Sequence, residues 1–421
     1  MSDRNAISKK AFALALGLSA ALSFAAAQET PNNGLFTFDA SFRERVQHIS
    51  NVDFTSDNAS IWTQRIALKA GFQPTDFFCA TVNVLNAVQS GDDKSPVDHN
   101  SLDLHEAFLD LGPQNAFLRA GRQELIFGSQ RLIGVRDGTN VRRTWNGLRL
   151  AAASGEWSAD FFAARPVAVE PTGVFNDDSD KNRLLAGAYA TGPAPAGKID
   201  LYYFFAETND RATIEGVADQ RRHSFGARLF NNDGAWFWNW EAVLQTGQQG
   251  DSDIRAWTVA GITGRRFGAL PLAPAFTLST NIASGDKRPH DGKLGTFDAL
   301  YPRGNYFSNL ALLGPANFFN VNPSLDLHPN PELTLTAGVN FYWRLELTDG
   351  VYSPSGMLYR APGDSTARYV NTALSLGAAY KATERLSFEA VYTHSAPGRF
   401  FRETGPDASI EFLELTMQVD I

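Results

Sequence analysis

The feature that most constrains this chain is a repeated segment, roughly ten residues long, in which apolar and polar side chains alternate. In the first such segment Phe38, Ala40 and Phe42 fall on one face, while Arg43 and Arg45 fall on the other. Alternation of this kind places successive side chains on opposite faces of a β-strand. One segment is a weak signal, but its repetition is typical of the strands of a transmembrane β-barrel.

Tight turns and longer polar loops separate these segments in alternation, as expected for periplasmic turns and external loops. Eight short turns are predicted at 73–75, 112–115, 154–155, 191–197, 231–234, 268–274, 328–331 and 381–384. Nine longer loops are predicted near 49–60, 89–100, 128–140, 166–181, 208–220, 247–253, 285–317, 348–367 and 396–408. The connections predict an all-β, antiparallel barrel of 18 strands. Its least regular strand is the fourteenth, at 318–327, which Pro323 interrupts.

The N-terminus has the pattern of a secretory signal peptide. Basic residues precede an apolar run over 11–24, which ends in alanines before Gln28. We therefore predict a cleaved signal peptide at 1–27 and a mature barrel domain at 28–421, exported to the outer membrane. A retained membrane anchor is the alternative, although the run is short for a helix that spans a bilayer.

Composition excludes several other classes of protein. After Gln28 the chain has no apolar run of about 18 residues, so helical membrane spans are not expected. Aromatic residues make up 12% of the chain and charged residues only 19%, and no linker divides it as two soluble sandwiches would require. The lone Cys79 excludes an intramolecular disulfide. With a net charge of −8 and no basic tract, the chain is a poor candidate for nucleic-acid binding.

Several sequence blocks carry a family resemblance. The first group comprises LHEAFLDL at 104–111, GRQEL at 121–125, GSQRL at 128–132 and RDGTNVRR at 136–143. In this order and spacing they closely resemble the alginate-export family. Further matching segments are IASGD at 282–286, LGTFDALYPRG at 294–304, DGVY at 349–352 and RETGP at 402–406. The resemblance implies an outer-membrane barrel of 18 strands whose positively charged constriction passes a polyuronate outward.

Arginine on the polar face of the strands suits such a task. A guanidinium stays charged and offers a planar fork to a carboxylate, and rings of such groups select anions in pores. From the strand faces and the sequence blocks we predict the following pore-lining, substrate-binding residues: Arg43, Arg45, Arg65, Lys69, Arg119, Arg122, Glu124, Arg131, Arg136, Arg142, Arg143, Arg149, Arg228 and Arg344. Supporting acids that hold arginines in fixed rotamers are expected at Glu106, Asp137 and Asp160, as well as at Glu124; simple charge balance is the alternative for these acids.

Two features of the blocks leave structural alternatives open. Arg122 falls on the opposite parity from Arg119, which aims it at lipid in a regular strand, where a charge is costly. We expect a bulge near Gly121 to reset its face, and the alternative is a position beyond the membrane. The connection at 128–140 either folds inward as a constricting loop or remains a solvated external loop.

Motifs for catalysis are not found in the sequence. The seven histidines form no HExxH pair, no G-x-S-x-G elbow occurs, and we predict neither enzymatic activity nor a cofactor or metal. Residues 192–198 have the spacing of a phosphate-binding loop, but Ile199 lacks the hydroxyl that such a loop supplies to magnesium. They predict a periplasmic turn.

The sequence therefore predicts a monomeric channel for anionic polysaccharide, in contact with outer-membrane lipid and with periplasmic polysaccharide-synthesis proteins as possible partners. A porin for uptake of small organic acids or oligosaccharides also needs a basic lumen, so it is the main alternative. An outer-membrane barrel hydrolase and a soluble β-rich carbohydrate binder are alternatives of other classes.

Overall fold

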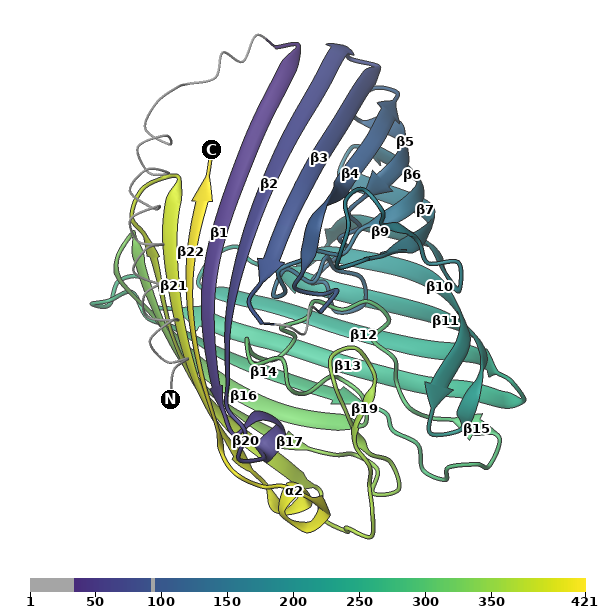
Figure 1. The fold of residues 1–421 in the computed structure, drawn as a ribbon, viewed down its shortest axis with the longest axis vertical. Helices are drawn as coiled ribbons and strands as arrows, with labels where there is room; N and C mark the ends of the chain where they lie inside the picture. The colour runs from purple at the N-terminus through teal and green to yellow at the C-terminus, as the bar shows by residue number, and fades with distance from the viewer. Residues whose placement is uncertain (1–33, 92–94) are drawn as a thin grey trace.

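Strand β1 (Phe36–Ser50) is hydrogen-bonded on both sides, to β2 (Ala59–Thr75) and to β22 (Ile410–Asp420), and this pairing closes the sheet into a barrel (Figure 1). The structure, a computed structural model, describes residues 34–91 and 95–421. The predicted signal peptide, 1–27, lies outside the described residues. Within the described ranges, no helix has the length and apolar character of a membrane span.

Eighteen long antiparallel strands form the wall in the described part of the chain, so the predicted fold class and strand number are confirmed. Besides β1, β2 and β22 these are β3 (Phe78–Gln89), β4 (Asn100–Leu111), β5 (Ala116–Gln123), β6 (Trp145–Ser154), β7 (Trp157–Ala168), β9 (Arg183–Ala194), β10 (Gly197–Thr213), β11 (Gly216–Asn231), β12 (Trp236–Gln249), β13 (Ser252–Arg266), β14 (Ala275–Ala283), β16 (Phe318–Asn330), β17 (Leu333–Trp343), β20 (Tyr369–Lys381) and β21 (Leu386–Pro397).

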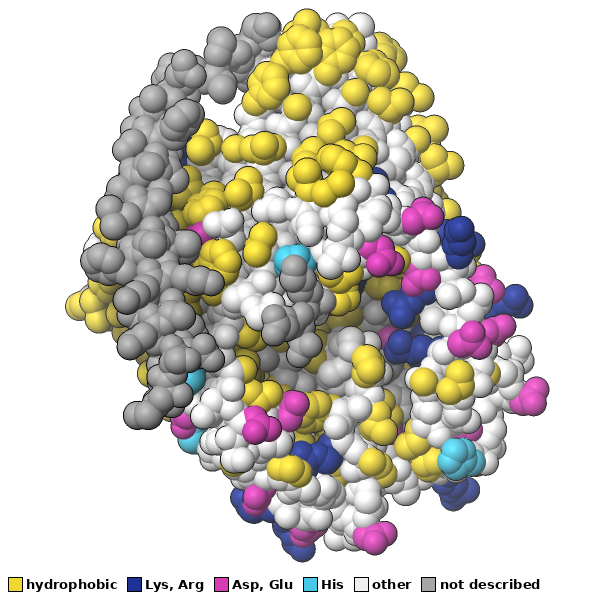
Figure 2. Space-filling view, in the orientation of Figure 1, with side chains coloured by type: hydrophobic (Ala, Val, Ile, Leu, Met, Phe, Trp, Pro, Cys, Tyr) yellow, Lys and Arg dark blue, Asp and Glu magenta, His cyan; other side chains and the backbone are white. Residues whose placement is uncertain are grey.

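Short elements lie in the loops. They are the 3-10 helix η1 (Val52–Phe54), the helix α2 (Arg399–Thr404) and the strands β8 (Asp178–Ser179), β15 (Lys293–Leu294), β18 (Val351–Tyr352) and β19 (Leu358–Arg360). Figure 2 shows charged side chains gathered toward the end of the molecule that carries α2 and β15, whereas hydrophobic side chains cover the opposite end. The long polar loops therefore share one end of the barrel.

The alternation of side chains separates an apolar outer face from a polar inner face. Phe38 and Leu68 are 57% and 58% exposed on the outside of β1 and β2. On the same two strands Arg43, Arg45 and Arg65 are buried on the inside. Because successive residues of a strand point to opposite faces, one sequence pattern produces both surfaces.

Strand β16 confirms the predicted fourteenth strand and shows how it accommodates Pro323. On one side Pro323 pairs with Leu278 of β14. On the other side the ladder to β17 skips from Val321 to Ser324. Proline has no N–H to donate, so it is tolerated where the ladder is interrupted.

Two predicted long loops are instead strands. The prediction of a loop over 208–220 is wrong, because β10 continues to Thr213 and β11 begins at Gly216. Likewise 247–253 is mostly strand, since β12 ends at Gln249 and β13 begins at Ser252. Their polar composition resembles that of a loop, but cross-strand contacts such as Gln220 Nε2 to Gln249 Oε1 at 2.9 Å continue the ladder.

Two loops fill part of the barrel interior. Apolar residues of the connection between β5 and β6, including Leu125, Phe127 and Ile133, pack against Phe162 and Phe204 of the wall. A second loop joins them through a parallel bridge between Ile133 and Tyr301. The interior of the barrel therefore contains an apolar core at this level, and the remaining passage is bounded by loop as well as wall.

Candidate functional site

The connection over residues 124–144, named here the inward loop, is held against the inner face of β1. The Arg43 guanidinium donates to the carbonyl oxygens of Asp137 at 3.1 Å and Thr139 at 2.7 Å. The Arg45 guanidinium donates to the Gly138 carbonyl at 2.5 Å. The loop therefore folds inward. Of the two alternatives for residues 128–140, an inward loop and a solvated external loop, the structure has the first.

Asn140 fastens the same loop to the neighbouring strands. Its side-chain Nδ2 donates to the carbonyl oxygens of Gln64 at 2.8 Å and Val88 at 3.3 Å. Its backbone N–H donates to Asp98 Oδ1 at 2.8 Å. Asn140 is 1% exposed, so these contacts satisfy a buried amide that would otherwise be costly.

Four guanidinium groups gather where the inward loop meets the wall, and we call Arg43, Arg45, Arg65 and Arg142 the arginine cluster. Arg142 Nη1 lies 2.6 Å from Asp137 Oδ1, and Arg65 Nη1 lies 3.7 Å from the same atom. Arg45 Nε lies 3.6 Å from Glu414 Oε2.

A second carboxylate supports the cluster from behind. Glu124 receives hydrogen bonds from Arg142 Nε at 2.6 Å and Nη2 at 2.8 Å, and it lies 2.8 Å from His105 Nε2. Four guanidinium groups therefore face the carboxylates of Glu124, Asp137 and Glu414, and the carboxylate of Glu389 also interacts electrostatically with Arg45 and Arg43.

The loop carboxylates are ionised at neutral pH. Burial raises the pKa of Glu124, but hydrogen bonds from His105 and Arg142 outweigh it and lower the pKa to about 2. Burial also raises the pKa of Asp137, and the charges of Arg142 and Arg65 shift it below its usual value. The side chain of Asp137 is nevertheless 60% exposed, so it is the carboxylate of the cluster that a solute can reach.

Within the part of the chain that the structure describes, two buried nitrogens of the cluster make no hydrogen bond. Arg43 Nε and Arg65 Nη1 are buried and make no hydrogen bond in the described structure. A buried donor without an acceptor costs free energy, since it has lost water and gained nothing in return. An anion that reached these atoms would supply the missing acceptors.

Other predicted lining residues are paired across the strands. Arg119 forms two hydrogen bonds of 2.7 Å with Asp110, and Arg149 Nε lies 2.7 Å from Asp160 Oδ1. The remaining such pairs are Arg228 Nε with Asp200 Oδ2 at 2.6 Å and Lys69 Nζ with Glu106 Oε2 at 3.3 Å. Arg131, in the inward loop, pairs with a wall residue: its Nη1 lies 2.7 Å from Glu241 Oε2.

Sequence reasoning found Glu106 and Asp160 as supporting acids but missed Asp110, Asp200 and Glu241. A usable signal was present for Asp110. Counting outward from the predicted turn at 112–115 places Asp110 opposite Phe117, on the same sheet face as Arg119, which is its partner in the β4–β5 register two residues further along. Glu241 pairs with a loop arginine, and no local count predicts such a contact.

Three predicted residues hold loops instead of facing the passage. Arg344 is 1% exposed and donates to the carbonyls of Ala367 at 2.8 Å and Leu347 at 3.1 Å. Arg143 donates to the Gly134 carbonyl at 3.2 Å and stacks over Tyr301. Arg136 donates to the Val141 carbonyl at 3.4 Å. These three guanidinium groups are surrounded by backbone carbonyls of folded loops. The alternation of residues along single strands cannot predict such contacts, so the positions differ from the predicted ones.

Arg122 is accommodated differently from the expectation. The ladders of β5 with β4 and β6 run through Gly121 without a shift of register, so the expected bulge near Gly121 is wrong. The register shifts instead between β3 and β4, where Asn83 pairs with Glu106 but Val84 pairs with Leu104, so that one residue of β4 is skipped. Arg122 Nη1 donates to Asp103 Oδ1 at 3.2 Å and to the Leu104 carbonyl at 2.7 Å.

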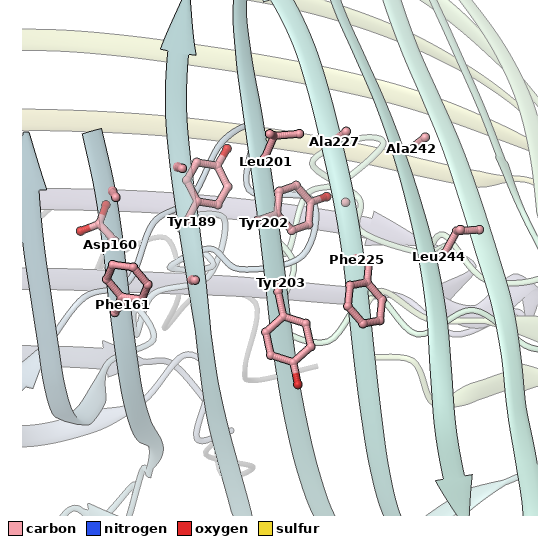
Figure 3. Close-up of a pocket in the computed structure, with 14 residues that line it drawn as sticks. Asp160, Phe161, Tyr189, Leu201, Tyr202, Tyr203, Phe225, Ala227, Ala242 and Leu244 are labelled. Atoms are coloured by element: carbon pink, nitrogen blue, oxygen red, sulfur yellow. The ribbon is translucent and has the colours of Figure 1, made fainter. Parts of the chain in front are cut away.

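An apolar pocket of about 610 Å³ lies away from this site, along β7 and β9 to β12 (Figure 3). Its lining includes Phe161 and Leu244, which are 54% and 63% exposed on the outer face. Alanines at 159, 188, 190, 227 and 242 leave a hollow between these larger side chains. The pocket belongs to the outer wall of the barrel and has no contact with the arginine cluster.

Comparison with known proteins gives a family and a fold. A model of the family described as alginate export matches residues 35–413. No curated protein matches the chain. Similar solved structures include Pseudomonas aeruginosa OccK2 (OpdF) in complex with glucuronate, with 15% identity, coverage of 92% of this chain and 96% of that chain, and a TM-score of 0.64.

Two further structures have the same architecture. Pseudomonas aeruginosa OpdK with vanillate is 12% identical, with 92% and 98% of the two chains covered and a TM-score of 0.63. Acinetobacter baumannii OccAB2 is 10% identical, with 93% and 99% covered and a TM-score of 0.64. At these identities the likeness shows the fold alone, that of an outer-membrane β-barrel. The family match spans nearly the whole described chain, and the protein belongs to the alginate export family.

Proposed function

We propose that this channel passes anionic carbohydrate and that the arginine cluster is the constriction that binds its uronate carboxylates. The observation that carries the proposal is the pair Arg43 and Arg65, which face each other in the β1–β2 ladder and each retain a buried guanidinium nitrogen that makes no hydrogen bond to the described residues. The nitrogen of Arg65 lies 3.7 Å from the exposed carboxylate of Asp137. Two adjacent guanidinium groups repel one another, and an anion between them relieves that repulsion.

The neighbouring acids suit passage better than tight binding. A conducting site must bind its solute strongly enough to admit it and weakly enough to release it. Asp137 lies within reach of Arg65 and Arg142, so it competes with an incoming carboxylate for the same cations. Exchange between the fixed carboxylate and a mobile one gives a low barrier to movement along the passage.

A porin for small organic acids remains the second candidate. The inward loop and the apolar core around Phe127 narrow the interior, which favours short solutes. Structures with this fold include one with bound vanillate and one with bound glucuronate, and both ligands carry a carboxylate. The two candidates share the cationic site and differ in the length of the solute.

Planar-bilayer recordings of the purified protein test the proposal. We expect anion over cation selectivity, block of the current by alginate oligomers, and weaker block by neutral oligosaccharides of equal length. Current block by glucuronate and benzoate without block by oligomers would favour the porin. Cation selectivity of the intact protein would refute the carboxylate-binding constriction.

A further inference from the structure

A relay of three asparagines crosses the inner wall on the side of β14, β16 and β17. Asn281 Nδ2 donates to Asn320 Oδ1 at 2.8 Å, and Asn320 Nδ2 donates to Asn340 Oδ1 at 2.8 Å. All three side chains are buried. In such a chain the orientation of one amide fixes that of the next, because each amide donates through its nitrogen and accepts through its oxygen.

The backbone fixes the direction of this relay. The Asn281 N–H donates to Asn320 Oδ1 at 3.0 Å, and a backbone N–H can only be a donor. The oxygen of Asn320 must therefore point toward β14 and its nitrogen toward Asn340. The oxygen of Asn340 is used in turn, which turns its Nδ2 away from the relay.

The last donor of the relay has no acceptor. Asn340 is 5% exposed, and its Nδ2 makes no hydrogen bond in the described structure. Leaving a buried amide donor without a partner costs free energy, whereas an acceptor on a bound solute recovers it. The open end of the relay thus indicates a ligand position.

Asn340 lines a cavity of about 300 Å³ on the inner wall, at the lower end of the range of small-molecule sites. Its polar lining residues are amides, hydroxyls and one carboxylate: Ser308, Asn309, Asn322, Ser324, Thr336, Asn340, Tyr342, Ser375 and Glu389. Lysine and arginine are absent from this lining. The volume suits one small ring or sugar unit, and the neutral donors and acceptors suit hydroxyl groups.

Glu389 and Phe307 narrow the chemistry of the ligand further. The carboxylate of Glu389 accepts hydrogen bonds from hydroxyls and repels another carboxylate. Phe307 contributes an aromatic ring from the loop side, which can pack against the C–H groups of a sugar. A pyranose supplies hydroxyl donors, acceptors and C–H groups together, and a simple carboxylic acid does not.

The cavity adjoins the arginine cluster through two contacts. Asn309, which lines the cavity, donates through Nδ2 to Glu414 Oε1 at 3.0 Å. The other oxygen of Glu414 lies 3.6 Å from Arg45 Nε. The neutral pocket and the cationic site are therefore neighbours across one carboxylate.

We propose that this cavity is a sugar subsite, which takes the hydroxyl-bearing face of one pyranose ring. Asn340 Nδ2, which has less than 1 Å² of accessible surface in this structure, turns toward the bound ring and donates to it. As a subsite for uronates it rests on the proposed function, because the cavity would bind the hydroxyls of a uronate while the arginine cluster binds a carboxylate. Its preference for hydroxyls also applies to neutral hexoses and can be measured with them alone.

The test compares three probes on single channels: glucuronate, glucose and benzoate, which carries a carboxylate but no hydroxyl. The variant Asn340→Leu removes the free donor at similar volume. We expect it to weaken block by glucuronate and by glucose about tenfold and to leave block by benzoate unchanged. Asn371→Leu is the matched control, since Asn371 is an equally buried inward asparagine that does not line the cavity.

A second variant keeps the test independent of the relay. Ser375→Leu fills the cavity without touching the three asparagines and should produce the same selective loss, with folding checked by the heat-dependent gel shift of the barrel. Unchanged glucose and glucuronate block in both folded variants would overturn the subsite, as would an equal loss for all three probes. If the intact channel is cation-selective yet Asn340-dependent glucose block persists, the constriction proposal fails and the subsite stands.

Discussion

Arg43 and Arg65 are cross-strand partners in the β1–β2 ladder, and both point into the barrel, where the inward loop meets them. Arg43 uses its guanidinium to hold two loop carbonyls, whereas Arg65 makes only a long contact with Asp137. Arg43 thus serves to hold the loop, whereas Arg65 has fewer contacts and is the better placed to bind a solute.

Charge removal at Arg65 should lower anion selectivity. Arg65→Gln removes one unit of charge from the cluster, worth about 1 kcal/mol at 4 Å in water, so the anion-to-cation permeability ratio should fall about fivefold. Reversal potentials in a salt gradient measure the ratio. Arg255→Gln, at an exposed arginine outside the cluster, is the control and should leave it unchanged. An equal fall in both variants would contradict a local role for Arg65.

Asp137→Asn should have the opposite effect. The substitution removes the exposed carboxylate from Arg65 and Arg142, so an incoming uronate meets less competition and should block about fivefold more tightly. Asp253→Asn alters another half-exposed carboxylate near an arginine and is the control. Titration of the current with glucuronate measures the affinity, and weaker block by the Asp137 variant would disprove the competition.

Acid should loosen the Arg142 end of the inward loop only well below neutral pH, when Glu124 loses its contacts with Arg142 and His105. The pKa of Glu124 in the folded protein, about 2, lies below that of a free glutamate near 4.3. A depressed pKa contributes stability above the unfolded value, and that contribution is lost as pH falls through the folded value. Single-channel conductance should stay constant from about pH 7 to 5 and become noisy between about pH 4 and 2.

Glu124→Gln is the corresponding control for the acid response. The variant lacks the titrating carboxylate, so its loop should already be mobile at neutral pH and its noise should change less on acidification. Identical pH profiles for the two proteins would mean that another group governs the loop.

Gly121→Ala should destabilise the barrel through one backbone contact. Gly121 has a φ of +131°, and a Cβ there would lie 2.2 Å from the Ala107 carbonyl oxygen. Gly155→Ala is the control, because Gly155 also has a positive φ, +59°, but open space around it. The Gly121 variant should lose on the order of 1–3 kcal/mol more than the control in urea unfolding. Equal losses would show that the close contact is relieved elsewhere.

The wall of the barrel could be predicted because each strand carries its own period of two residues. The faces of Phe38 and Arg43 follow from that period alone. The hairpin that joins β10 to β11 has the sequence pattern of a loop because its polar residues form no apolar face. An apolar face predicts which part of a strand contacts lipid. It does not predict how far the strand pairing continues past the lipid-facing part.

The sequence indicates which arginines are candidates for the site. It does not indicate how they are brought together. Arg43, Arg65 and Arg142 stand out in the sequence as charges beside the barrel strands and the RDGTNVRR block. The contacts of Arg43 and Arg65 with the inward loop join residues more than 70 positions apart, such as Arg43 with the Thr139 carbonyl. Alternation along a strand contains no information about such partners. The asparagine relay was missed for the same reason, since its three members look like ordinary polar residues.

The manner in which the inward loop is anchored affects how this channel can diverge. Arg43 and Arg45 hold the main-chain oxygens of residues 137 to 139, groups that every amino acid possesses. Side chains at the tip of the loop can consequently be exchanged while the attachment persists. The charge that the loop presents at residue 137 can therefore change while the scaffold that holds it stays intact.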